Sequence, residues 1–151
     1  MQVEIVEIGP MRLHSVLHRG PVSQIPLAWR RLEAWLSARG LRDHVQLATG
    51  LCEQAPNQAG DIVYRAGVVL RDAVAASDDV EIVEAPGGRY ACYRHVGPHS
   101  EIAEAFQKLY REWLPASGFQ PDDRPALDIC RSDPRVTPEK ELVTDLLLPV
   151  R

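Results

Sequence analysis

The stretch His18-Arg19-Gly20-Pro21-Val22-Ser23-Gln24-Ile25 decides the fold, because it returns later as His95-Val96-Gly97-Pro98-His99-Ser100-Glu101-Ile102. Residues 3–32 and 80–109 share 13 identities at a constant offset of 77 residues, which marks an internal repeat. Solenoid repeats are shorter, about 20–50 residues, so the pattern indicates one supersecondary unit that is present twice. Two such copies are expected to pack about a pseudo-two-fold axis, with a central cleft at their seam.

In both halves the spacing of the apolar residues changes in the same order, from the alternation of a strand to the spacing of a helix and back to alternation. Alternation predicts strands, and a stripe at helical spacing predicts one helix after each Gly-Pro pair. Ser23 is expected to cap the first helix, and Pro115 with Gly118 to stop the second. The expected elements are strand residues 3–17 around a break at 9–10, helix 23–39, strands 45–53, 61–70, 80–84 and 89–96, helix 100–114, and strands 126–132 and 141–148.

This order predicts an α+β fold made of two strand-helix-strand-strand modules. Both helices are expected on one face of a mainly antiparallel sheet. A chain of 151 residues with 45% hydrophobic letters is long enough for one buried core and too short for two comfortable domains. We therefore expect one domain over residues 1–151, with internal repeats 1–76 and 77–151 that share a core.

Composition excludes several classes of function. The net charge is −4 and no run of Lys or Arg stands out, so direct nucleic-acid binding is not expected. No apolar run reaches the ~18 residues of a membrane span, and the first residues do not resemble a signal peptide, which predicts a cytoplasmic protein. The three cysteines are widely spaced, as is typical of reduced thiols.

The histidines do not predict a metal site. His14 and His18 lie four residues apart on an expected strand, and Gly97-Pro98 interrupts the similar pair of His95 and His99. A His-Glu-x-x-His signature is absent, and so are phosphate-binding and dinucleotide-binding glycine loops. We expect neither a metal nor a cofactor, and we expect His18 and His95 to hydrogen-bond the turns that begin the two helices.

Asp128 is the most informative charge. In Ala126-Leu127-Asp128-Ile129-Cys130 it points away from Leu127 and Ile129 on an expected strand. One interpretation is a carboxylate on the wet face of a sheet. The other is a carboxylate in a mostly apolar pocket, where it would be an effective counter-charge for a cation.

Aromatic residues supply candidate walls for such a pocket. Trp29 and Phe106 occupy equivalent positions and are expected in the core, because their spacing is what helix packing requires. Tyr93 stands where the other copy has Val16, and an aromatic on one side only of a symmetric pair points to a site. Further candidate ligand contacts are Tyr64, Trp35 and Trp113.

Several of these segments together resemble the GyrI-like small-molecule-binding family, which also forms the effector-binding domain of AraC- and MerR-type multidrug regulators. The resemblance spans nearly the whole chain. It is carried by the doubled His-x-Gly-Pro, by Gly87-Gly88-x-Tyr90-Ala91, by Leu109-Tyr110-x-x-Trp113-Leu114-Pro115-x-Ser117-Gly118, and by Glu141-Leu142-Val143-Thr144-Asp145 with Leu148-Pro149-Val150.

The resemblance implies a cleft that accepts bulky aromatic compounds, often cations. The family's pocket Glu, two residues before an aromatic, falls on Asp128 here, and the aromatic falls on Cys130. Both are departures from the family pattern. The residue after each Gly-Pro is often a pocket aromatic in the family, and here it is Val22 or His99.

Three functions remain open from the sequence. The first is a stand-alone protein that binds or sequesters amphipathic aromatic compounds, with Asp128 as counter-charge, Tyr93, Tyr64 and His99 as walls, and Glu141 as a second acid near the mouth. The second is a hydrolase of cyclopropane-bearing DNA-alkylating toxins, as some family members are. The third is an interaction protein that inhibits DNA gyrase. Because the duplication uses the whole sequence, we expect no attached helix-turn-helix domain, so any effect on transcription would need a protein partner.

Overall fold

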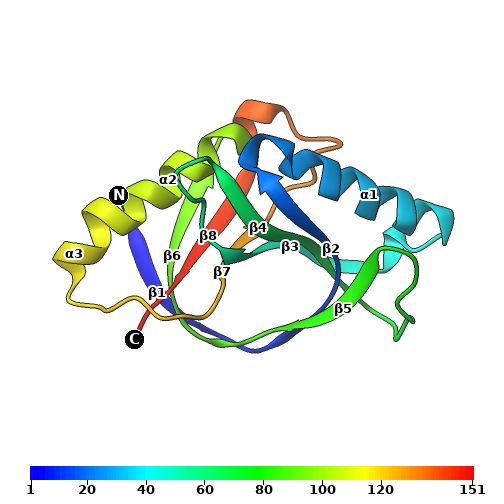
Figure 1. Cartoon of the computed structure of the whole chain (residues 1–151), viewed down its shortest axis with the longest axis horizontal. Helices are drawn as coiled ribbons and strands as arrows, with labels where there is room; N and C mark the ends of the chain where they lie inside the picture. The colour runs from blue at the N-terminus through cyan, green and yellow to red at the C-terminus, as the bar shows by residue number, and fades with distance from the viewer. The chain divides into compact units, whose positions relative to one another are not determined.

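All 151 residues are described by a computed structural model, which divides into two units (Figure 1). Residues Pro10–Pro86 form one unit, named here the α1 unit after its helix. Residues Met1–Gly9 and Gly87–Arg151 form the other, named the α2 unit. Each unit contains four antiparallel strands and one helical segment that follows a Gly-Pro pair. The predicted α+β class with a mainly antiparallel arrangement is confirmed.

The α1 unit has the strand order β3-β4-β2-β5. Helix α1 packs against β2 and β4, as Figure 1 shows. The strands are β2 (Met11–Pro21), β3 (Val45–Gln54), β4 (Asp61–Leu70) and β5 (Val80–Ala85), the helix is α1 (Ile25–Ala38), and short 3-10 turns cover Val22–Gln24 and Arg42–His44.

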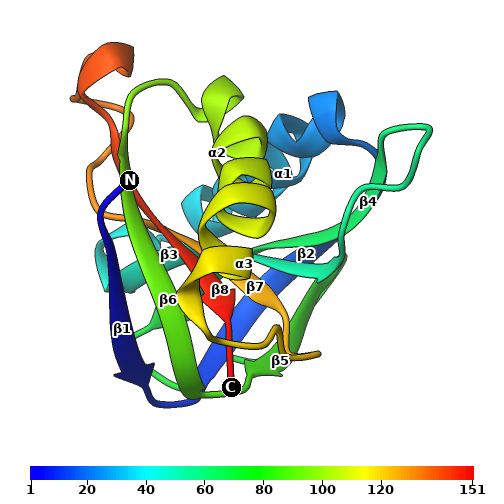
Figure 2. The same cartoon turned by 90° about the vertical axis from the view of Figure 1, so that its left-hand side faces the viewer.

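The α2 unit has the equivalent order β7-β8-β6-β1. Its helical segment runs on through a π-helical turn, so that Figure 2 shows it as one continuous rod. The strands are β1 (Val3–Ile8), β6 (Gly88–Val96), β7 (Ala126–Cys130) and β8 (Val143–Pro149), the helical pieces are α2 (Ile102–Lys108), the π turn Leu109–Trp113 and α3 (Leu114–Ser117), and 3-10 turns cover His99–Glu101 and Glu139–Glu141.

The first strand of each sequence half pairs within the other unit. β1 pairs with β6 and β5 pairs with β2. The links Gly9-Pro10 and Pro86-Gly87 explain this exchange, because a two-residue hairpin needs positive φ values that proline cannot adopt. Neither Gly9 nor Gly87 has a positive φ, so neither link forms such a turn. The packing units therefore differ from the sequence halves 1–76 and 77–151.

Both helices begin in the same way. Gly20 and Gly97 have φ values of 141° and 140°, a region that side chains rarely adopt. His18 Nε2 lies 2.8 Å from the carbonyl oxygen of Pro21, and His95 Nε2 lies 3.3 Å from that of Pro98. The prediction that these histidines hydrogen-bond the turns is confirmed.

The predicted cap at Ser23 is wrong. A 3-10 turn comes first, the capping position falls on Gln24, and no side chain caps the helix. The φ of Pro21 is −58°, which already directs the chain into this tight turn. The turn's own backbone bonds therefore take the place of a side-chain cap.

The helix ends differ from each other. Gly40, with φ 64°, ends α1, and the amides of Leu41 and Gly40 donate to the carbonyls of Leu36 and Ser37, respectively. Pro115 does not stop the second helix, which continues to Ser117. Proline is tolerated there because it occupies the first turn after the π-helical segment, and the helix ends before Gly118.

Each helix covers an apolar cluster on one face of its sheet. In the α1 unit, Leu32 and Trp35 pack on Val16, Ala66 and Val68. In the α2 unit, Leu109 and Ala105 pack with Ala91, Leu146 and Leu148. Trp29 and Phe106 border their own clusters, in agreement with the prediction that they belong to the packing of each helix.

Candidate functional site

Asp128 and Tyr93 lie in one row across the helix-covered face of the α2 unit. Leu146 of β8 pairs with Tyr93 of β6 on one side and with Asp128 of β7 on the other. Paired residues of neighbouring strands point to the same face, and two strand spacings place the two Cα atoms about 10 Å apart. Leu146 is fully buried, whereas Asp128 is half-buried at the margin of the apolar cluster. The structure thus places one acid beside the hydrophobic core of this unit.

A second, more polar row lies next to the first. Thr144 of β8 pairs with His95 of β6 and with Cys130 of β7. Its hydroxyl is buried, with 1% of the residue exposed, and Oγ1 has no hydrogen-bond partner. An unpaired buried hydroxyl is costly, about 1–3 kcal/mol, so a hydrogen-bond donor that reached this atom would be stabilising.

The environment beside Asp128 has a low polarity. Burial raises the pKa of the Cys130 thiol to about 12, and the negative charge of Asp128 contributes to this increase. Cys130 is therefore a neutral thiol near pH 7 and does not serve as a thiolate nucleophile. Asp128 also makes an electrostatic interaction of its own. A carboxylate accepts about four hydrogen bonds, so such an interaction leaves room for a cation.

The equivalent positions of the α1 unit are filled differently. Its pairing registers place Tyr64 where the α2 unit has Thr144, and Gly50 where it has Asp128. Tyr64 is 5% exposed and its hydroxyl accepts a hydrogen bond of 3.2 Å from Trp29 Nε1. Phe106 replaces Trp29 in the other copy and carries no N–H group. The aromatic candidate Tyr64 thus lies in the closed core of the α1 unit.

Trp35 is also a core residue of the α1 unit. Its Nε1 donates to Ser77 Oγ over 3.0 Å, and the Arg39 guanidinium lies 4.7 Å from the ring centroid. The ring centroid of His14 lies 5.9 Å away. These contacts hold the indole within the packing of α1 against the sheet.

His99 and Glu141 lie in 3-10 turns of the α2 unit. Loss of solvation lowers the pKa of His99, and the nearby His95 adds to the decrease, while Glu139 opposes it. His99 is therefore neutral near pH 7, although part of its surface is open to solvent. Glu141 is exposed, and its backbone amide donates to the Pro138 carbonyl.

Trp113 borders a separate hollow at the end of the helical segment. Its ring stacks on Phe119, with centroids 6.1 Å apart and planes inclined by 17°. The hollow of about 410 Å³ is also lined by Met1, Glu112, Ala116 and Ser117. Of the seven predicted site residues, Asp128 and Tyr93 share a face of one sheet, and Trp113 lines this different surface.

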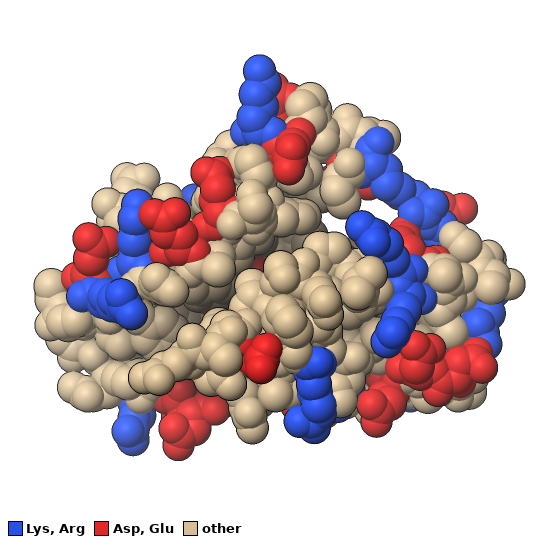
Figure 3. Space-filling model, turned by 45° about the horizontal axis from the view of Figure 1, so that its top comes forward, with Lys and Arg blue, Asp and Glu red and all other residues tan.

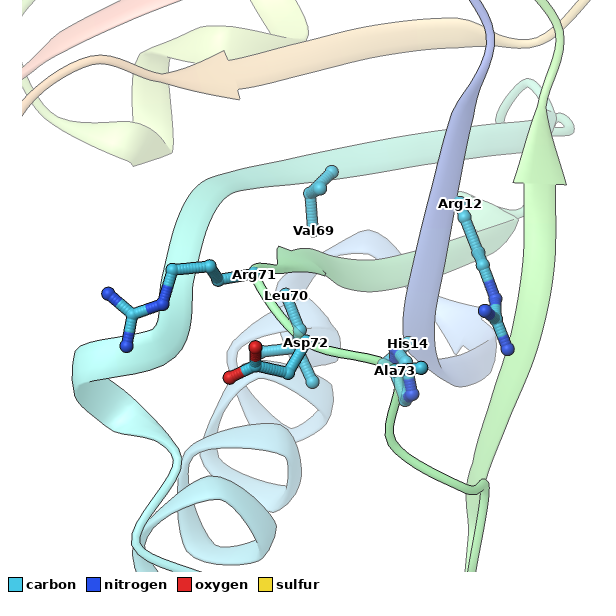
Figure 4. A pocket seen from close by; sticks show the side chains of 7 residues that line it. All are labelled: Arg12, His14, Val69, Leu70, Arg71, Asp72 and Ala73. Carbon is cyan, nitrogen blue, oxygen red and sulfur yellow. The ribbon is translucent and has the colours of Figure 1, made fainter.

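A second hollow, of about 210 Å³, lies at the edge of the α1 unit and was not anticipated from the sequence. Figure 4 shows Arg12 and Arg71 on opposite sides of it, with Asp72 and His14 between them. His14 Nε2 lies 2.7 Å from the Val74 carbonyl oxygen, and His44 Nδ1 lies 2.6 Å from Asp72 Oδ2. Its residues come from the strands β2 and β4 and from the loop after β4, which share no sequence motif.

On the opposite face of the α2 sheet, Asp145 lies between two arginines. Its carboxylate accepts hydrogen bonds of 2.8 Å from Arg94 and from Arg131. Burial would raise the pKa of Asp145, but these hydrogen bonds outweigh it and hold the pKa below its ordinary value. A short-range sequence pattern could not reveal this trio, because its members come from three strands.

The charged surface has no single sign on the face shown in Figure 3, where acidic and basic side chains alternate. No group of three or more His, Cys, Asp or Glu side chains is arranged to hold a metal ion. No helix combines the length and the apolar character needed to cross a bilayer.

Similarity to known proteins agrees with this architecture. A family model described as a GyrI-like small molecule binding domain matches residues 1–151. A DNA gyrase inhibitor of Edwardsiella ictaluri is 30% identical over 158 residues, covering 100% of this chain and 99% of that protein. Transcriptional regulator BrlR of Pseudomonas aeruginosa is 30% identical over 76 residues, which are 50% of this chain and only 27% of the regulator.

Two solved structures share the fold at low sequence identity. EcmrR in its DNA complex superposes with a TM-score of 0.82 at 16% identity, covering 99% of this chain and 57% of EcmrR. SAV2435 bound to tetraphenylphosphonium superposes with a TM-score of 0.71 at 14% identity, covering 100% of this chain and 94% of SAV2435. The family model matches every residue, and so this chain belongs to the GyrI-like small molecule binding domain family.

Proposed function

We propose that this small-molecule-binding domain takes up bulky aromatic cations, with Asp128 as the counter-charge. The observation that carries the proposal is the position of that acid, half-buried beside the apolar cluster under α2. A protein of this kind acts as an effector-binding or sequestering protein. Tyr93 and His99 of the α2 unit are the proposed walls of the site, and Glu141 is a proposed second acid. Tyr64 and Trp35 lie in the core of the α1 unit and Trp113 lines a different hollow, so these three candidates are left out of the proposed site.

The electrostatics favour a cation over an anion. At an effective dielectric constant of about 20, two opposite charges at 4 Å attract by about 4 kcal/mol before desolvation is subtracted. The raised pKa of Cys130 reflects the burial of this thiol, two residues along the strand from the half-buried Asp128. A single carboxylate in such surroundings is enough to set the charge preference of a site.

A relative of the same fold supports the size and type of ligand. SAV2435 has been solved bound to tetraphenylphosphonium, a bulky aromatic cation. At 14% identity the comparison shows the fold alone, so the ligand class is carried to this chain by Asp128 and its apolar neighbours.

The test compares tetraphenylphosphonium with tetraphenylborate, which has nearly the same shape and the opposite charge. Calorimetric titration of the wild type is expected to show binding of the cation and at least about tenfold weaker binding of the anion, which is about 1.4 kcal/mol. Asp128→Asn keeps the size of the side chain and should remove this preference. Equal affinity for both ions in the wild type would contradict the proposal, as would an unchanged preference in Asp128→Asn.

Hydrolysis of a cyclopropane-bearing alkylator is the competing function. Asp128 and Tyr93 could supply a carboxylate and a phenol, but they lie two strands apart with the buried Leu146 between them. The neutral Cys130 thiol offers no nucleophile. We therefore expect binding without efficient turnover, because misplacement of a catalytic group by about 1 Å costs about a hundredfold in rate. Mass spectrometry of ring-opened product decides this, and multiple turnovers lost in Asp128→Asn would establish a hydrolase.

Inhibition of DNA gyrase is the third candidate, since the Edwardsiella relative carries that name over its whole length. A gyrase supercoiling assay with purified protein distinguishes it from simple ligand binding. Inhibition that persists in Asp128→Asn would indicate a protein interface separate from the ligand site. A regulatory role through a transcription-regulator partner would instead require that the ligand changes the partner's affinity.

A further inference from the structure

We infer that Thr144 makes this site selective for planar aromatic cations that carry N–H donors, such as aryl amidinium ions, over cations without N–H groups. The inference rests on the proposed function and deepens it by naming the chemical group that the ligand presents. It starts from the buried Oγ1 of Thr144, which has no partner within the protein.

The two units differ in the reach of the hydroxyl at this position. In the α1 unit the phenol of Tyr64 extends toward the helix and accepts a hydrogen bond from Trp29 Nε1. In the α2 unit Thr144 replaces the phenol and Phe106 replaces the indole, and a threonine hydroxyl stays close to the backbone. This buried hydroxyl has no donor within the protein and is suited to a donor that comes from outside.

Thr144 is also close enough to Asp128 to act on the same ligand. Thr144 pairs with Cys130, two residues after Asp128 on β7, so it is the diagonal neighbour of Asp128 on the same face. Diagonal neighbours lie about 7–8 Å apart. Two hydrogen bonds of about 2.9 Å each, joined by the two nitrogens of one amidinium, can bridge that separation.

The two residues that pair with or flank Thr144 leave it as the hydrogen-bond acceptor of this row. Cys130 stands beside Thr144 as an uncharged, half-buried thiol. On the other side, His95 Nε2 is engaged with the Pro98 carbonyl. Thr144 is therefore the group of this row whose hydrogen-bonding capacity is unused.

The experiment uses two cations of the same charge and carbon framework: 2-naphthamidinium and its N,N,N′,N′-tetramethyl derivative, which has no N–H group. Both are titrated calorimetrically into the wild type, Thr144→Val and Thr144→Ser. The wild type should prefer the amidinium. Thr144→Val, which keeps the side-chain shape, should weaken it about fivefold to tenfold and leave the tetramethyl cation within about twofold. Thr144→Ser restores the hydroxyl and should restore the preference.

The outcomes separate this inference from the proposed function. If Thr144→Val changes both affinities equally or changes neither, the inference is wrong. A charge preference that still depends on Asp128 would then leave the proposed function intact. If neither cation binds the wild type, the inference is wrong, and the titration with tetraphenylphosphonium decides the proposed function separately. Thermal unfolding of each variant confirms that a lost preference is not a loss of folding.

Discussion

The two units share one frame and differ in what fills the space beneath the helix. The α1 unit closes its face with Tyr64 hydrogen-bonded to Trp29, and Gly50 stands where the α2 unit carries Asp128. The α2 unit has Thr144 and Phe106 at the matching positions, and its hydroxyl is unpartnered. One copy therefore uses its hydroxyl at this position within the core, and the other carries a buried, unpartnered hydroxyl beside an acid.

The opposite faces differ as well, by an inversion of charge. In the α2 unit Asp145 lies between Arg94 and Arg131. At the equivalent position of the α1 unit, Arg65 lies 2.6 Å from Glu53 and 3.4 Å from Glu81. In this duplicated fold, the equivalent position holds an acid in one unit and a base in the other. In each unit, residues of opposite charge from neighbouring segments pair with it. Backbone geometry and local charge are thus separable in this fold.

The shared frame predicts equal losses from equivalent core truncations. Leu32 and Leu109 occupy matching helix positions and are 1% and 0% exposed. Leu32→Ala and Leu109→Ala should each lower the free energy of unfolding by about 3 kcal/mol, because each leaves a cavity under its helix. Urea denaturation measures both, with the exposed Leu27→Ala as a control that should change little. A loss in one unit that is several times larger than in the other would break the comparison.

The charge inversion predicts an acid-sensitive contribution from Asp145. Its pKa is lowered in the folded state, so its stabilising effect is present above the ordinary pKa and disappears as the pH falls through the folded value. Asp145→Asn should lower the unfolding free energy by about 2 kcal/mol at pH 7.

The difference between Asp145→Asn and the wild type should shrink when urea denaturation is repeated near pH 3. Asp78→Asn is the matched control, because that carboxylate pairs with Arg39 at an exposed site and should contribute little. A difference that is the same at both pH values would show that the ion pairs are not its source.

The two hydroxyls should respond with opposite signs. Tyr64→Phe removes the acceptor of Trp29 Nε1 and should destabilise the protein by about 1 kcal/mol. Thr144→Val removes an unpartnered buried hydroxyl and should stabilise it by about 1 kcal/mol in the absence of ligand. Melting temperatures of the two variants provide the measurement. Destabilisation by Thr144→Val would indicate that Oγ1 has a partner, such as an ordered water.

Much of this architecture could be predicted from the sequence, because short sequence patterns within each repeat indicate its elements. The His-x-Gly-Pro motif predicts each helix, since the turn before the helix needs glycine, and the alternation of apolar residues predicts the strands. The exchange of β1 and β5 between the units could not be predicted, because strand pairing depends on residues far apart in sequence. The exchange depends on whether Gly9-Pro10 and Pro86-Gly87 form tight hairpin turns, and neither link does.

The candidate site was accessible to sequence reasoning only in part. Alternation along β7 placed Asp128 opposite to Leu127, and the asymmetry between Val16 and Tyr93 marked the α2 unit. Thr144 escaped notice, since a threonine in a strand is ordinary until the structure shows that its hydroxyl is buried without a partner. The arginines around Asp145 escaped for the same reason, because they meet it only in the folded sheet.

The central claim is that the α2 unit, rather than the α1 unit, holds the charged end of the ligand. Backbone amide chemical shifts of the ¹⁵N-labelled protein, followed during titration with tetraphenylphosphonium, test it directly. The account predicts that the largest shifts fall on Asp128, Cys130 and Thr144, with smaller shifts around Tyr93. Shifts that spare these residues and cluster in the α1 unit, around Gly50 or around the hollow beside His14, would contradict it.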